Sequence, residues 1–322
     1  MNTNVDLYRH AAARDRQLCG ATRGQRSGRV RFIVASLGSA LWFSGGLAHA
    51  DVPPRPDAAE SLVRARLIAE STSLQRDRSA WLAIQLTMKP GWHTYWRNPG
   101  DSGLATSIKW TLPRGVTIGT TVWPRPGRFV SRSIVGYGYS ADVALLTKVT
   151  VSAGFASDRV TVGASVSWLA CSEVCIPGAE ALKLTLPVSD TAPEPDPAQV
   201  SLFAETRSRI PQPAPFEATF TMDHDRIQLR FPRTAAPGVG ELSAAFYPFD
   251  SSLIDHAAPQ SVLQDKQRVE LTLRRSPVSG DQLGTLDGLL IVERLTGGNM
   301  KSSAFDVFAK RAKGAAKPRQ AR

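Results

Sequence analysis

The feature that most constrains the fold is a pair of segments in which apolar and polar side chains alternate with a period of two. Apolar residues stand at every second position of Val160–Trp168 and of Leu182–Leu186. Such alternation is typical of strands that bury one face. The two segments flank a short loop that contains Cys171 and Cys175. We therefore predict a β-hairpin whose closed end carries both cysteines.

Strand-like patterns recur along most of the chain after Asp51. They lie at residues 62–68, 81–86, 216–220, 227–231, 269–273 and 289–292. Prolines at 193, 195 and 197 mark a linker, and Gln199–Arg209 is expected to form a short helix that stops before Pro211. We predict an all-β chain with one sandwich over 51–190, a proline-rich linker with the helix over 191–213, and a second, smaller sandwich over 214–309.

The first fifty residues are typical of a secretory signal. Residues 1–31 hold seven arginines and two aspartates, an apolar run follows from Phe32 to Leu47, and the segment ends in Ala48-His49-Ala50. The run is shorter than the ~20 apolar residues that a membrane span needs. A signal peptide over 1–50, cleaved before Asp51, therefore predicts export. No later stretch is apolar enough to cross a bilayer, so we expect a soluble mature chain of about 270 residues.

The net charge of +11 is confined to the two ends of the chain. Residues 51–309 carry equal numbers of basic and acidic side chains, whereas residues 310–322 are strongly basic. We interpret this last segment as a solvated, disordered tail. Because no aromatic residues are interleaved with its charges, nucleic acid is not expected as a partner.

Cysteine usage points to one chemical site. Cys19 leaves with the signal peptide, so the mature chain keeps Cys171 and Cys175, an even count that allows a disulfide in an oxidising compartment. A ring this small stabilises a fold by only about 2 kcal/mol, less than a bridge between distant strands. That comparison favours thiol–disulfide exchange over a structural bridge, although the spacing alone leaves both open.

A second dense segment, Lys89–Gly103, holds three large aromatic residues and His93 within five positions. It is either a core strand that runs into a loop or an aromatic wall beside the sulfurs, where His93 would bias a thiolate. His224 and His256 have no metal-ligand spacing to the cysteines. The chain also lacks a nucleophile elbow and a glycine-rich phosphate loop. No cofactor and no metal are therefore expected.

At these two segments the sequence resembles the periplasmic N-terminal region of the DsbD family of thiol:disulfide interchange proteins. It is most similar to the ScsB branch, which is associated with suppression of copper sensitivity. The resemblance is carried by Lys89–Gly103, Trp110–Val116, Trp123-Pro124, Gly136–Tyr139 and Trp168–Pro177. These residues follow the family's order over most of 60–190, and residues 196–309 resemble the second part of that region more loosely.

The resemblance implies an immunoglobulin-like sandwich in the periplasm whose cysteine pair passes electrons to oxidised client proteins. Cys175 would form the mixed disulfides, Cys171 would resolve them, and Tyr95 would lie beside them. Trp123 and Phe129 are the candidates for the aromatic cap that shields the pair in family members. The remaining neighbours expected around the pair are His93, Trp96, Trp168, Glu173 and Pro177.

Two departures from the family bear on function. The Cys-x3-Cys spacing is tighter than in the best-known DsbD branch, and full-length members continue into a membrane domain and a thioredoxin-like domain. We therefore expect a separate membrane-embedded electron donor or thioredoxin-like protein as partner. The alternative is a non-catalytic binding module with a structural disulfide that holds a client protein or copper, since two thiolates with Met88 or His93 suit Cu(I).

Overall fold

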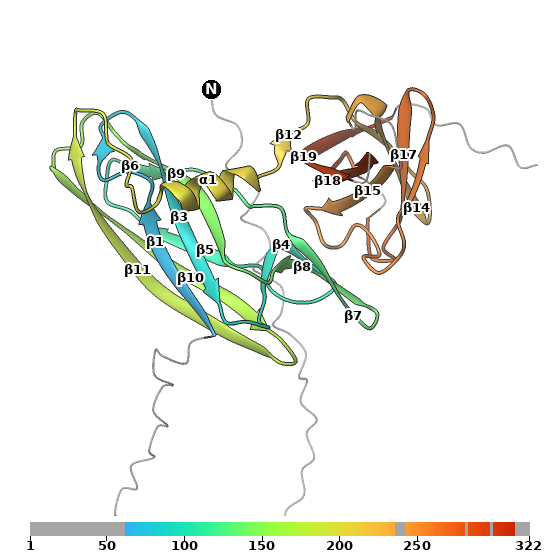
Figure 1. Ribbon diagram of the computed structural model, residues 1–322, viewed down its shortest axis with the longest axis horizontal. Coiled ribbons are helices and arrows are strands. Elements are labelled where there is room, and N and C mark those ends of the chain that lie inside the picture. Colours follow the sequence, from blue (N-terminus) through green and yellow to red (C-terminus); the bar gives the residue numbers. More distant parts are fainter. Residues whose placement is uncertain (1–61, 236–241, 281–282, 297–298, 313–322) are drawn as a thin grey trace, which may run out of the picture. The chain divides into compact units, whose positions relative to one another are not determined.

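Strands make up nearly all of the regular structure in the computed structural model, which describes residues 62–235, 242–280, 283–296 and 299–312 (Figure 1). The predicted signal peptide lies outside these residues. Of the tail expected over 310–322, Lys310 and Arg311 instead belong to the last strand, and residues 313–322 lie outside the described residues. No helix within the described ranges is long and apolar enough to cross a membrane. The all-β class predicted from the sequence is confirmed.

Two four-stranded sheets build the first sandwich. The first sheet has the order β1 (Val63–Ala69), β3 (Ser79–Met88), β9 (Val143–Val151) and β6 (Val116–Ile118). The second has the order β2 (Leu74–Gln75), β11 (Cys175–Ser189), β10 (Arg159–Cys171) and β5 (Ser107–Thr111). A small sheet of β4 (Thr94–Gly100), β8 (Ile134–Tyr139) and β7 (Gly127–Ser131) completes this region.

The predicted hairpin is the long β10–β11 pair, which Figure 1 shows as the two longest strands of this sandwich. The apolar positions of Val160–Trp168 are all buried, and the serines and threonine between them are exposed. They pack on Leu82, Ile84 and Leu145 of the facing sheet. The two-residue period therefore places one face of β10 in the core, as the sequence predicts.

The second strand-rich region encloses a core of its own. Its hydrogen-bonded path runs in this order: β15 (Leu242–Pro248), β18 (Thr285–Thr296), β19 (Asn299–Arg311), β13 (Thr219–Met222), β14 (Arg226–Pro232), β17 (Arg268–Arg274) and β16 (Ser261–Gln264). The short β12 (Gln212–Pro213) pairs with β19, and η2 (Arg233–Ala235) follows β14. Residues from strands far apart in this path meet in that core, for example Phe246 of β15 and Leu271 of β17.

The expected short helix is present as α1 (Val200–Ser208), which ends before Pro211. Its Phe203 is buried against Ala83 and Leu146 of the first sandwich. The proline-rich stretch before it is also held there, because the Asp196 amide donates to the Glu70 carbonyl at 2.8 Å. The segment expected to be a linker therefore packs on the first sandwich, and the domain limits drawn from the sequence stay a prediction.

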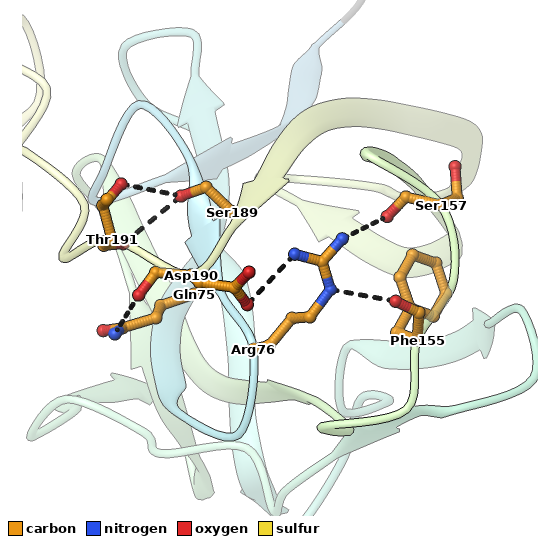
Figure 2. Close-up of polar contacts among 7 residues, drawn as sticks. All are labelled: Gln75, Arg76, Phe155, Ser157, Ser189, Asp190 and Thr191. Atoms are coloured by element: carbon orange, nitrogen blue, oxygen red, sulfur yellow. Dashed lines mark hydrogen bonds and ion pairs between the residues drawn. The ribbon is translucent and has the colours of Figure 1, made fainter.

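A polar network holds the open end of the β10–β11 hairpin (Figure 2). Arg76 donates from Nε to the Phe155 carbonyl at 2.9 Å and from Nη2 to the Ser157 carbonyl at 3.1 Å. Its Nη1 pairs with the Asp190 carboxylate at 3.2 Å, and Gln75 Nε2 donates to the Asp190 carbonyl at 2.9 Å. One guanidinium thus ties the loop before β10 to the residue after β11, because its planar fork carries five donors.

Candidate functional site

The two cysteines close the far end of the same hairpin. Cys171 is the last residue of β10 and Cys175 the first of β11, and they stand directly opposite each other with a disulfide between them and Cα atoms 4.1 Å apart. The turn is closed by a hydrogen bond from the Ser172 amide to the Val174 carbonyl at 3.0 Å. The last residue of β10 and the first residue of β11 therefore fix the distance between the sulfurs.

The two sulfur-bearing residues differ sharply in exposure. Cys171 is 2% exposed, whereas Cys175 and the three turn residues are exposed. Thiol–disulfide exchange requires an in-line approach of an incoming sulfur to one sulfur of the bond. This arrangement permits that approach at Cys175 and hinders it at Cys171.

His93 holds the backbone of Cys171 from the other side. The His93 amide donates to the Cys171 carbonyl at 2.9 Å, and the Cys171 amide donates back to the His93 carbonyl at 2.9 Å. Because Cys171 uses both backbone groups on His93, its pairing with Cys175 is of the non-hydrogen-bonded type. In that type opposing Cα atoms approach most closely, at about 4.5 Å, which suits a disulfide.

Aromatic rings surround the His93 imidazole. The Tyr95 ring lies edge-on to it at a centroid distance of 5.3 Å, and the Phe129 ring lies tilted at 4.7 Å. Burial lowers the pKa of His93 below its usual 6.5 and raises the pKa of Tyr95 above its usual 10. Both side chains are therefore neutral at neutral pH. Of the two candidate cap residues, Phe129 is the one that contacts this group.

A glycine makes room for Tyr95. Gly103 has a φ of 108°, and a Cβ at that position would lie 2.4 Å from the Tyr95 ring. A side chain there would both strain the backbone and displace the ring. Gly103 was part of the motif that suggested the family, but nothing local in the sequence indicated its contact with Tyr95.

Three further predicted residues line the hairpin near its tip. The Trp168 indole lies over Gly178, where a Cβ would come within 2.5 Å of Nε1, and Pro177 stands opposite Leu169. Trp168 and Pro177 also border an apolar open groove of about 520 Å³ together with Leu104. Glu173 is exposed in the turn. The sequence analysis did not single out Leu104, because an isolated leucine in a loop carries no pattern.

Trp96 and Trp123 pack elsewhere. Trp96 is buried against Tyr137 and Phe249, with ring centroids at 6.4 and 5.9 Å. It follows Tyr95 directly in β4, so the two side chains project to opposite faces. Trp123 is partly buried against the main core of the first sandwich. The described contacts of both tryptophans are thus with the core.

Within the described residues, no group of three or more His, Cys, Asp and Glu side chains is placed to hold a metal ion. His256 is instead buried, with Nδ1 3.1 Å from the Tyr137 hydroxyl and Nε2 2.9 Å from the Ser251 carbonyl. His224 is exposed near the start of β14. The disulfide and its aromatic neighbours are therefore the candidate site.

Comparison with known proteins bears on this site. Residues 62–187 match the family described as thiol:disulfide interchange protein DsbD, N-terminal, which confirms the resemblance stated from the sequence. The N-terminal periplasmic domain of ScsB from Proteus mirabilis matches with a TM-score of 0.54 at 17% identity, over 79% of this chain and 96% of that chain. At that identity the structural match bears on the fold, and it agrees with an immunoglobulin-like sandwich.

Other solved structures align at lower similarity. The major pilin subunit BcpA of Bacillus cereus gives a TM-score of 0.25 at 10% identity, over 78% of this chain and 66% of that chain. A Porphyromonas gingivalis protein of unknown function gives 0.24 at 10% identity, over 78% and 100%. These scores are too low to carry an argument. No curated protein sequence matches the chain.

Proposed function

We propose that the chain exchanges disulfides with other proteins in the periplasm, because residues 62–187 match the DsbD N-terminal family of thiol:disulfide interchange proteins. The single observation that carries the proposal is the disulfide at the hairpin tip, with Cys175 exposed and Cys171 buried. A bridge that served only to hold the sandwich would not need one open sulfur.

The proposed reaction uses the two cysteines in turn. In the reduced state, the Cys175 thiolate attacks one sulfur of a client disulfide, forms a mixed disulfide and releases the client's other sulfur as a thiolate. Cys171 then attacks the Cys175 sulfur, which forms the internal disulfide and expels the client's remaining thiolate. The client gains two electrons and two protons, and the cysteine pair loses them.

The oxidised pair needs a reductant before it can act again. The family implies a membrane-embedded donor or a thioredoxin-like protein for this step, and oxidised periplasmic proteins as the recipients. The exposed side chains of Val174 and Ile176 flank Cys175 in sequence, and exposed Leu104 borders the groove with Pro177, so we expect such a partner to dock on this apolar surface. A role in copper tolerance, which the resemblance to the ScsB branch implies, stays a prediction.

Single-cysteine variants of the full chain test the assignment. Cys171→Ala should accumulate a covalent complex with a partner on non-reducing gels, because the resolving thiol is gone. Cys175→Ala should accumulate little, since the remaining sulfur is buried, and the double variant is the control for adventitious bands. Equal trapping would remove the division of roles. No trapping, together with a disulfide that dithiothreitol cannot open in the folded protein, would favour the binding module with a structural bridge.

A further inference from the structure

His93, Cys171 and Cys175 stand in one row across three neighbouring chain segments. His93 is the antiparallel partner of Cys171, and Cys171 is the antiparallel partner of Cys175. Directly opposed residues project their side chains to the same face, with Cβ atoms about 4.5–5.5 Å apart. The imidazole therefore adjoins the buried sulfur and is one strand further from the exposed sulfur.

From this row we propose that His93 accepts the proton of the Cys171 thiol when Cys171 resolves a mixed disulfide. The inference rests on the proposed exchange function and adds to it the residue that activates the second sulfur. The two backbone hydrogen bonds to Cys171 and the packing of the ring between Tyr95 and Phe129 hold the imidazole in place.

The burial of Cys171 creates the need for such a group. A thiolate is the nucleophile in exchange, and a thiol that is 2% exposed has little water to take its proton. Exposed Cys175 has no such need. Because only Cys171 is buried, only the resolving sulfur needs a neighbouring base.

The other titratable groups on the surrounding elements are less suited to the role. On β4, Tyr95 has a raised pKa and stays a protonated phenol at neutral pH. On β7, the Arg128 guanidinium donates to the His256 carbonyl and is a cation. On β8, Tyr137 and Tyr139 are buried phenols with raised pKa values. Glu173 is exposed in the turn, beyond the disulfide from His93.

The lowered pKa of His93 agrees with this role, because a neutral imidazole has a nitrogen that can accept a proton. In the proposed step, the Sγ–H proton of Cys171 passes to that nitrogen. The Cys171 sulfur attacks Cys175 Sγ, the bond between Cys175 and the client breaks, and the client sulfur leaves with the electron pair as a thiolate. The imidazolium then gives its proton to that thiolate or to solvent.

Single-turnover reaction of the reduced full-length protein with one equivalent of dithiobis(nitrobenzoate) separates the two steps. Attack by Cys175 releases the first coloured thiolate, and resolution by Cys171 releases the second. His93→Gln should leave the rate of the first phase within about twofold of wild type and slow the second phase about 100-fold at pH 7, the lower end of the range of general base catalysis. The rate of the second phase should then increase steeply with pH in the variant and less steeply in wild type.

The controls make each outcome decisive. His224→Gln, the same change at an exposed histidine, should leave both phases unchanged. His93→Phe keeps an aromatic ring against Tyr95 and Phe129 but removes the base. It should also show the slow second phase, and it serves as the test variant if His93→Gln disturbs the fold. If the second phase is as fast in both His93 variants as in wild type, the role of His93 is overturned and the exchange function is not. No release of thiolate by reduced wild-type protein would instead overturn the exchange function.

Discussion

The two ends of the β10–β11 hairpin are held in different ways. At one end the turn is exposed, and a disulfide joins exposed Cys175 to buried Cys171. At the other end the strands are held by noncovalent contacts. There, β2 pairs with the last residues of β11, and Arg76 bridges the loop before β10 and Asp190. The difference separates two tasks. In the proposed function, the open end holds the strands in register while the disulfide at the cysteine end breaks and forms.

The largest expected effect lies at the open end. Leu74, in β2, is 1% exposed and packs in the main core. Leu74→Ala should lower the free energy of unfolding by about 3 kcal/mol, because it removes buried methyl groups and leaves a cavity. Urea denaturation of the oxidised protein measures this loss. The rate at which the folded variant reacts with a probe disulfide should not change, and a parallel loss of exchange would show that the two ends are coupled.

Arg76→Ala should lower the free energy of unfolding by about 2 kcal/mol, because it removes hydrogen bonds from a charged donor to two carbonyls and one carboxylate. The matched control is Arg78→Ala, a change at an exposed side chain two residues away, which should alter stability by less than about 0.5 kcal/mol. Thermal or urea unfolding of both variants checks this. Equal stability of the two would mean that the network in Figure 2 does not hold the hairpin.

At the cysteine end, the double variant Cys171→Ala/Cys175→Ala should abolish exchange but lower the free energy of unfolding by at most about 2 kcal/mol, because the closed ring is so small. Comparison of urea transitions of wild-type protein and this variant, both measured without reductant, tests the expectation. A loss above about 4 kcal/mol would assign the disulfide a structural role, and the contrast between the two ends would fail.

The smallest effect concerns pH. The pKa of His93 is lowered in the folded protein, so the unfolded chain binds a proton there first as pH falls below 6.5. Stability contributed by neutral His93 is thus present above pH 6.5 and decreases as pH falls toward the lowered pKa. Wild-type protein should lose more stability than His93→Phe between pH 7 and pH 5 in urea titrations. Parallel pH profiles would contradict the burial of the imidazole.

The sequence predicted one end of the hairpin better than the other. The alternation of Val160–Trp168 and the cysteine spacing give local signals, so the strands and the turn could be read directly. The contact of Arg76 with Asp190 joins residues far apart in the chain and leaves no periodic trace. Trp96 was expected beside the cysteines but lies in the core. It is adjacent to Tyr95 in the same strand, and adjacent strand residues project to opposite faces of the sheet.

The contact between His93 and Cys171 shows the limit of such predictions. Nearness of the two segments was expected from the family resemblance, but the register that sets His93 directly opposite Cys171 depends on how β4, β8 and β10 pack. No residue between positions 93 and 171 encodes that register by itself. Phe129 was likewise expected as a cap, and its ring packs on His93, a contact that the sequence did not indicate.

The reduction potential of the Cys171–Cys175 disulfide in the folded protein tests the central claim most directly. Equilibration with glutathione or thioredoxin buffers, followed by alkylation of free thiols, gives the value. The account predicts reversible opening at a potential above about −300 mV, the region of exchangeable disulfides, with the same value in Arg76→Ala. A potential below about −300 mV, or a disulfide that opens only when the protein unfolds, would show that the hairpin tip carries a structural bridge and would contradict the account.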